Sequence, residues 1–256
     1  MIPRLLCQTW RSAALPEAAG RLQAGWRRRN PEFTYRFYDD AACRAVVAAA
    51  FPDYLADYDR LPVPVMKADV FRYAVIFRDG GLYADIDMEC LKPIGPVLKG
   101  GTCIFSVEAH LGRTRQRELG YARGLQVANC IFAAEPRHPL LGAAVARSIE
   151  LFRAHGSGQP VPVEDITGPR MLTRLLSERV WPGLVLLPQI VLMAPLDYPD
   201  IWPINRHMHA RHKTFGSWKA PGARPSPWRR FVERNRWPNP LPFGLGGPIW
   251  GREVDR

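Results

Sequence analysis

Two kinds of hydrophobic pattern alternate along the chain, short apolar runs and longer amphipathic stretches, and their succession predicts an α/β fold. The short runs, which predict strands, are residues 5–10, 33–38, 82–87, 102–107, 126–133 and 184–187. The longer stretches, which predict helices, are residues 39–50, 65–78 and 139–155, followed by one that opens at Thr167-Gly168-Pro169. Strands that alternate with helices favour a mostly parallel sheet with helices packed against it.

Residues with strong positional preferences mark the ends of these helices. Asp39 or Asp40 can cap the first helix, because a short carboxylate accepts bonds from the free N–H groups of a first turn. Gly80 and Gly81 follow the second helix and supply a left-handed stop. Thr167 is a candidate cap for the last helix.

The composition indicates one globular domain followed by a different C-terminal segment. The chain has 256 residues, 47% of them hydrophobic, which is enough for one sizeable core and too apolar for a disordered protein. From residue 220 onward, seven prolines are interleaved with tryptophan and arginine. We therefore expect a domain over residues 1–219 and a basic, proline- and tryptophan-rich tail over residues 220–256.

Positive charge is concentrated towards the C-terminus. The formal net charge is +11, and residues 206–256 carry +8 of it. Such an excess indicates an anionic partner, which can be a membrane surface, a phosphorylated substrate or a nucleic acid. Because no helix-turn-helix, RNP or zinc pattern accompanies the charge, we do not expect a nucleic-acid partner. The tail suggests contact with an anionic bilayer, although its tryptophans can equally pack against the domain; the candidate contacts are Arg224, Trp228, Arg229, Arg230 and Trp237.

Three sequence features bear on the compartment. The first residues are strand-like, with no charged segment before an apolar run, so we expect no secretory signal. The most apolar stretch, residues 180–196, is interrupted by three prolines, which argues against a spanning helix. The five cysteines form no C-x-x-C pair, so neither a disulfide framework nor a zinc site is indicated. We expect a cytoplasmic protein, peripheral on the inner face of the membrane if the tail binds there.

The most informative polar residues are Asp85 and Asp87, at the end of the predicted strand 82–87. Side chains two positions apart in a strand point to the same face, and ligands of open α/β sheets collect at the carboxyl ends of strands. Two adjacent carboxylates repel unless a cation lies between them, and Mg²⁺ or Mn²⁺ suits carboxylate oxygens. Two alternatives are a pair of solvated aspartates and an aspartyl phosphatase. The phosphatase is disfavoured because Met88-Glu89-Cys90 follows where Thr or Val is usual.

The sequence around this pair resembles glycosyltransferase family 32, which includes the yeast initiating α-1,6-mannosyltransferase and bacterial capsular polysaccharide transferases. The resemblance is strongest over two blocks, Lys67-Ala68-Asp69-Val70-Phe71-Arg72-Tyr73 and Asp79-Gly80-Gly81-Leu82-Tyr83-Ala84-Asp85-Ile86-Asp87-Met88-Glu89-Cys90, and extends over about residues 1–218. It implies a GT-A-type fold, a nucleotide-sugar donor, a Mn²⁺ or Mg²⁺ ion and retention of anomeric configuration. Cys7 stands where many relatives have histidine.

The same resemblance implies roles for individual residues. The residues implied at the metal are Asp87, Asp85, His212 and Ser217, and those implied in catalysis are Asp85, Asp87 and Arg72. The residues implied at the donor are Trp10, Asp69, Arg72, Tyr83, Asp85, Asn129 and Trp218, and those implied at the acceptor are Asp165, Thr167 and Gly168. Without the resemblance, Asp69 and Arg72 are equally a local ion pair on one helix face, and Trp10 and Tyr83 are equally core aromatics.

The function expected from these observations is transfer of a hexose or N-acetylhexosamine from a UDP- or GDP-sugar. The acceptor is expected to be a glycan or lipid-linked saccharide in polysaccharide biosynthesis. Two alternatives are a non-enzymatic basic binding module and a catalytically inactive relative. The presence of Asp69, Arg72, Asp85 and Asp87 argues against inactivity, because an inactive site is free to lose them.

Overall fold

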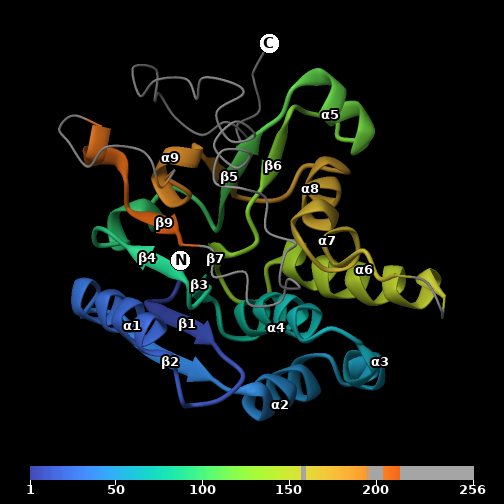
Figure 1. Cartoon of the computed structure of the whole chain (residues 1–256), viewed down its shortest axis with the longest axis horizontal. Coiled ribbons are helices and arrows are strands. Elements are labelled where there is room, and N and C mark those ends of the chain that lie inside the picture. Colours follow the sequence, from blue (N-terminus) through green and yellow to red (C-terminus); the bar gives the residue numbers. More distant parts are fainter. Residues whose placement is uncertain (157–159, 195, 197–203, 214–256) are drawn as a thin grey trace.

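The computed structural model describes residues 1–156, 160–194, 196 and 204–213, and its central feature is a seven-stranded sheet (Figure 1). Its strands are β1 (Leu5–Thr9), β2 (Thr34–Tyr38), β3 (Gly81–Ala84), β5 (Cys103–His110), β6 (Leu125–Val127), β7 (Ile131–Ala134) and β8 (Leu184–Leu187). They lie in the order β2-β1-β3-β7-β5-β6, and β8 also pairs with β5. All run in one direction except β6 and β7, so the predicted mostly parallel sheet is confirmed.

Helices and a second, smaller sheet complete the described residues. The α-helices are α1 (Glu17–Arg29), α2 (Asp40–Ala50), α3 (Leu55–Arg60), α4 (Pro64–Asp79), α5 (Arg113–Glu118), α6 (Pro139–His155), α7 (Val163–Ile166), α8 (Pro169–Ser177) and α9 (Gln189–Leu192). Single 3₁₀ turns occur at Pro52–Tyr54, Gly95–Leu98 and Ile204–His207. The second sheet pairs β4 (Met88–Cys90) with β9 (Ala210–His212) and lies beside α1 in Figure 1. None of the helices in the described ranges combines the length and the apolar composition that crossing a membrane requires.

Each face of the main sheet has its own hydrophobic core, because strand side chains alternate between the faces. Leu5 and Cys7 of β1 pack on the side of α2, α4 and α6. Leu6, between them, packs on the other side with Trp26 of α1. The first core is rich in aromatic rings, and Phe105 and Phe132 stack there with their centroids 4.8 Å apart. Phe71 of α4 packs edge-on against Tyr83 of β3 in the same core, and the acidic residues follow β3.

The turn from α4 into β3 depends on two glycines, as the sequence predicts. Gly80 and Gly81 have φ angles of 68° and 101°. At Gly81, a Cβ atom would lie 2.5 Å from the carbonyl oxygen of Leu5, closer than any real contact. The positive φ and this close approach of β1 explain why glycine follows α4 directly.

Three predicted elements need correction. The strand predicted over 82–87 ends at Ala84, and Asp85 and Asp87 lie in a turn in which Met88 N–H donates to the Asp85 carbonyl over 3.0 Å. The strand predicted over 126–133 is split into β6 and β7 by an irregular segment at 128–130. Gly168, not Thr167, is the N-cap of α8, because the Thr167 hydroxyl donates instead to Asp69. Asp39 does cap α2, and its side chain accepts from Ala42 N–H.

Candidate metal centre

The acidic turn after β3 is brought beside a distant histidine by the small second sheet. Asp85 N–H donates to the Cys130 carbonyl over 2.8 Å, which carries the β3–β7 pairing one residue further. The chain then turns into β4, and β4 pairs antiparallel with β9 so that Met88 lies opposite His212. His212 thereby lies next to Asp87 although 125 positions separate them in the sequence.

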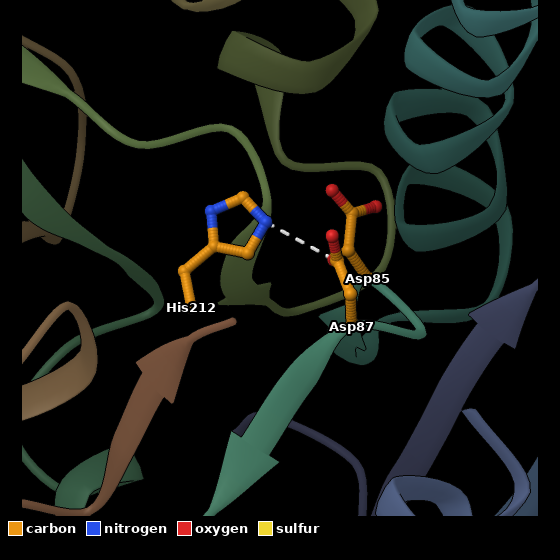
Figure 2. Close-up of side chains that lie close together, drawn as sticks. All are labelled: Asp85, Asp87 and His212. Atoms are coloured by element: carbon orange, nitrogen blue, oxygen red, sulfur yellow. Dashed lines mark hydrogen bonds and ion pairs between the residues drawn. The ribbon is translucent and has the colours of Figure 1, made fainter. Parts of the chain in front are cut away.

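Asp85, Asp87 and His212 each offer one ligand atom, and these atoms all lie within 4.8 Å of one another (Figure 2). His212 Nε2 is 3.0 Å from Asp87 Oδ1, and the backbone N–H of Lys213 donates to the Asp87 carbonyl. All three side chains are half-buried, so the cluster is reachable from solvent. Two carboxylate oxygens and one imidazole nitrogen at this spacing fit a divalent cation. This is the only such group of three acidic, histidine or cysteine side chains within the described part of the chain.

The two carboxylates and the histidine of the cluster influence one another's protonation. Burial raises the pKa of the Asp85 carboxyl, Arg72 offsets part of the rise, and the neighbouring Asp87 carboxylate adds to it. Burial disfavours the charged His212 ring, but Cys130 and Asp87 beside it hold the pKa of His212 well above its usual range. A divalent cation would compensate both carboxylates, and it would bind in competition with these protons.

Arg72 of α4 contacts the Asp85 carboxylate and orients it. Its Nη2 lies 3.1 Å from Asp85 Oδ1, and the guanidinium stands over the Tyr83 ring at 5.0 Å. Tyr83 Oη donates to the same Oδ1 over 2.7 Å. Since both contacts fall on Oδ1, Oδ2 is the Asp85 oxygen that remains available to a cation.

Arg72 is also part of a buried polar network centred on Asp69. Arg72 Nη2 lies 3.2 Å from Asp69 Oδ1, which also accepts from Asn129 Nδ2 over 2.9 Å. Asp69 Oδ2 accepts from the Thr167 hydroxyl over 2.8 Å. Asn129 reaches the network because it lies in the break between β6 and β7. The local ion pair between Asp69 and Arg72 is thus present, but as one part of a larger network that leads to Asp85.

The other predicted residues lie in different settings. Asp165 forms ion pairs with Arg170 and Arg174, at 2.9 and 2.8 Å. Gly168 packs so tightly on α7 that a Cβ would lie 2.8 Å from Glu164 Cα. Thr167 is fully buried. Their roles at an acceptor stay predictions. Ser217, Trp218 and the tail at 220–256 lie outside the described residues.

Trp10 follows β1 at the carboxyl edge of the sheet. Its indole Nε1 is buried and has no hydrogen-bond partner among the described residues. A cavity of about 430 Å³ lies at the same edge, with Thr9 on one wall and Lys67 and Ala68 of α4 on another. Ala68 directly precedes Asp69, which is itself buried and does not line this cavity. A larger hollow, about 570 Å³, lies between α1 and β2, and none of the predicted site residues lines it.

Two buried residues that contact the acidic turn were not assigned a role from the sequence. Gln8 donates to the Asp85 carbonyl, and Trp26 donates to the Met88 carbonyl. Gln8 could have been noticed in the sequence, because it is a long polar side chain inside an apolar strand and a buried amide must find hydrogen-bond partners. Trp26 gave no such signal, because a tryptophan on a helix is ordinarily a core residue.

Comparison with known proteins gives a family match and a fold match. Residues 16–104 match the family described as "Glycosyltransferase sugar-binding region containing DXD motif". The chain is 32% identical over 168 residues to "Initiation-specific alpha-1,6-mannosyltransferase" of Schizosaccharomyces pombe, a match that covers 61% of this chain and 42% of that protein. It is 32% identical over 97 residues to "Inositol phosphoceramide mannosyltransferase 3" of the same organism, covering 38% and 27% respectively. The chain thus spans less than half the length of these relatives.

A solved structure supports the architecture alone. The chain superposes on "PaToxG Glycosyltransferase" with a TM-score of 0.50 and 17% sequence identity, over 68% of this chain and 69% of that one. The mixed sheet, with its acidic turn at the carboxyl end of β3, is of the GT-A type, as the resemblance implied.

Proposed function

We propose that this chain is a member of glycosyltransferase family 32 and that it transfers a sugar from a nucleotide-sugar donor with a divalent cation held by Asp85, Asp87 and His212. The observation that carries the proposal is the convergence of these three side chains within 4.8 Å. Asp85 and Asp87 lie in a turn, and His212 lies in a strand far from it in the sequence. A turn with a purely structural role does not require a histidine beside its two carboxylates. Two carboxylates favour Mn²⁺ or Mg²⁺, and the imidazole nitrogen favours Mn²⁺, because Mg²⁺ takes oxygen ligands.

The bound cation would compensate the negative charge that develops on the departing nucleoside diphosphate. The protein's own part is to hold the ligands in place. Arg72 and Tyr83 fix Asp85 through Oδ1, which directs Oδ2 away from them. The Asp69 network in turn holds Arg72, whose side chain is only 4% exposed. Its burial makes Arg72 better suited to orienting Asp85 than to direct contact with a mobile donor.

The nucleotide part of the donor is proposed to lie at the carboxyl end of β1. The cavity beside Thr9 is also lined by Tyr58 and by Lys67 and Ala68 of α4, and Trp10 directly follows Thr9 in the sequence. The half-buried Trp10 side chain offers an aromatic surface on which a base can stack, whereas its Nε1 is itself buried. The names of both yeast relatives favour a mannosyl group as the sugar moved.

The acceptor is proposed to be an anionic glycan or lipid-linked saccharide. The segment 111–124, between β5 and β6, contains four arginines against one glutamate. Because β5 and β3 run in the same direction, this segment extends from the same sheet edge as the acidic turn. Arg113 and Arg117 are exposed and pair with no described carboxylate, and α5 carries both (Figure 1). One relative's name mentions a phosphorylated lipid, which agrees with an anionic acceptor. Contact of the tail with an anionic bilayer, and the cytoplasmic location, remain proposals.

Hydrolysis of the donor in the absence of acceptor tests the proposal directly. The purified chain is incubated with Mn²⁺ and a panel of UDP- and GDP-sugars that includes GDP-mannose. We expect one donor to be hydrolysed, and the activity to be lost on chelation and in Asp87→Asn. The matched control is Asp53→Asn, an exposed aspartate in a 3₁₀ turn, which should retain the activity. Absence of both hydrolysis and donor binding by calorimetry would show that the site has another use.

A further inference from the structure

Two buried side chains contact the main chain at both ends of the acidic turn. Gln8 Nε2 donates to the carbonyl oxygen of Asp85 over 3.2 Å. Trp26 Nε1 donates to the carbonyl oxygen of Met88 over 2.8 Å. Both side chains have no exposed surface. The two carbonyls belong to the first and last residues of the turn, so side chains from β1 and α1 fix it at either end.

The Gln8 amide is itself held in a single orientation. Its Oε1 accepts from Tyr35 Oη over 3.2 Å, and Tyr35 Oη accepts from Gln23 Nε2 over 2.8 Å. A chain of hydrogen bonds therefore runs from α1 through β2 and β1 to the turn. With Oε1 occupied by a donor, Nε2 is directed to the Asp85 carbonyl, and rotation of the amide would break both bonds.

This arrangement matters because the turn carries two carboxylates that repel each other when no cation is bound. Their ligand oxygens lie within 4.8 Å of each other, a separation at which two negative charges repel strongly. The backbone between them contributes to the separation of the carboxylates, and the two hydrogen bonds restrain the carbonyls at its ends. Held at both carbonyls, the turn keeps its ligands at the spacing a cation needs and avoids a rearrangement on binding.

We infer that Gln8 and Trp26 are positioning residues that set the affinity of the acidic turn for its cation. The inference rests on the proposed cation site. A merely structural role for these hydrogen bonds is the alternative, because a buried carbonyl without a partner destabilises any fold. The two roles differ in one observable. If the role is structural, loss of the hydrogen bond lowers the melting temperature alone; if the residue is a positioning residue, its loss also weakens cation binding by the folded protein.

The test is a titration of the full chain with Mn²⁺ without donor, in which electron paramagnetic resonance measures free Mn²⁺. The variants are Gln8→Met and Trp26→Phe, which remove the hydrogen bonds and keep apolar bulk. The matched control is Trp181→Phe, because Trp181 is also buried and donates from Nε1 to a carbonyl, that of Leu175. We expect Gln8→Met and Trp26→Phe to raise the dissociation constant about 10- to 100-fold, as loss of a residue that orients metal ligands typically does. Trp181→Phe should leave it unchanged.

Tyr35→Phe keeps the inference testable if a larger change prevents folding. It removes only the hydroxyl that holds Gln8 Oε1, and we expect a smaller increase in the dissociation constant, in the same direction. If Gln8→Met and Tyr35→Phe lower the melting temperature but bind Mn²⁺ as the unmodified chain does, the positioning role is wrong and the proposed function stands. If the unmodified chain itself binds no Mn²⁺, the proposed cation site fails, and the inference fails with it.

Discussion

Arg72 Nη2 lies 3.1 Å from Asp85 Oδ1, in a place where the arginine side chain is only 4% exposed. The same nitrogen lies 3.2 Å from Asp69. A charge buried this deeply is tolerated because two carboxylates and the Asn129 carbonyl surround it. Arg72 therefore links the folding of α4 to the position of a metal ligand.

The first prediction follows from this pair. Arg72→Gln leaves Asp69 and Asp85 without their buried cation, and we expect the free energy of unfolding to fall by about 3–5 kcal/mol. Urea denaturation measures the loss. Arg60→Gln is the control, because Arg60 is exposed and 3.7 Å from Asp57, and such surface pairs contribute about 1 kcal/mol or less. Equal stability of the two variants would contradict a structural dependence on Arg72.

The second prediction concerns the pH dependence of stability. Burial raises the pKa of the Asp69 carboxyl to about 6, well above the ordinary value for an aspartate. The native state then holds this proton more tightly than the unfolded chain does. The contribution of Asp69 to stability is thus full below about pH 4 and is lost as the pH rises through 6.

Asp69→Asn has no carboxyl to titrate and tests this directly. The stability of the unmodified chain relative to Asp69→Asn should fall by up to about 3 kcal/mol between pH 4 and pH 7. Urea denaturation at several pH values measures the difference, with the exposed Asp53→Asn as control. A difference that stays constant with pH would show that Asp69 is already ionised at pH 4.

A third prediction concerns the turn between α4 and β3. Gly81→Ala places a methyl group 2.5 Å from the Leu5 carbonyl at a φ of 101°, and Gly100→Ala places one in open space at a φ of 108°. Both substitutions carry the backbone cost of positive φ, about 1–2 kcal/mol. Only Gly81→Ala also forces β1 and β3 apart, so it should be destabilised further by about 1–3 kcal/mol. The melting temperatures of the two variants show whether Gly81→Ala is the more destabilised. Equal values would mean that the turn relaxes to accommodate the methyl group.

A fourth prediction tests the arginines of α5 as a contact for anionic lipid. We expect the double variant Arg113→Gln, Arg117→Gln to bind phosphatidylglycerol vesicles about 30-fold more weakly at low salt in a co-sedimentation assay, since each arginine contributes about 1 kcal/mol at such a surface. The control, Arg4→Gln with Arg28→Gln, removes the same charge from exposed positions elsewhere. If both double variants lose binding equally, net charge and not α5 is responsible. Inorganic phosphate as competitor then separates headgroup binding from binding of free anions.

The elements that the sequence predicts well are those with local causes. The helix 139–155 and the strand 184–187 have the predicted bounds, because Pro139 starts the helix and turn residues flank the strand. Helix α1 was not predicted, since glycines at 20 and 25 interrupt its pattern and Trp26 is its main buried anchor.

The parts of the site that were not predicted depend on distant contacts. The predicted strand to Asp87 is too long because its pairing with β7 stops at Ala84 and the chain then turns. His212 was expected at the metal from family resemblance alone, and β4 and β9, which place it, are too short to leave a hydrophobic pattern. The meeting of Asp69, Asn129 and Thr167 likewise depends on three separate elements and on no local motif.

The pairing of β4 with β9 also has a consequence for biosynthesis. Asp87 leaves the ribosome 125 residues before His212, an interval of about 6–25 s at ordinary rates of translation. During that time the nascent chain carries the acidic turn without its histidine. The three ligands of the proposed cation site are therefore assembled only when nearly all of the described chain has been made. A protein released early by premature termination would keep most of the sheet and the acidic turn, yet it would lack one of the three proposed cation ligands.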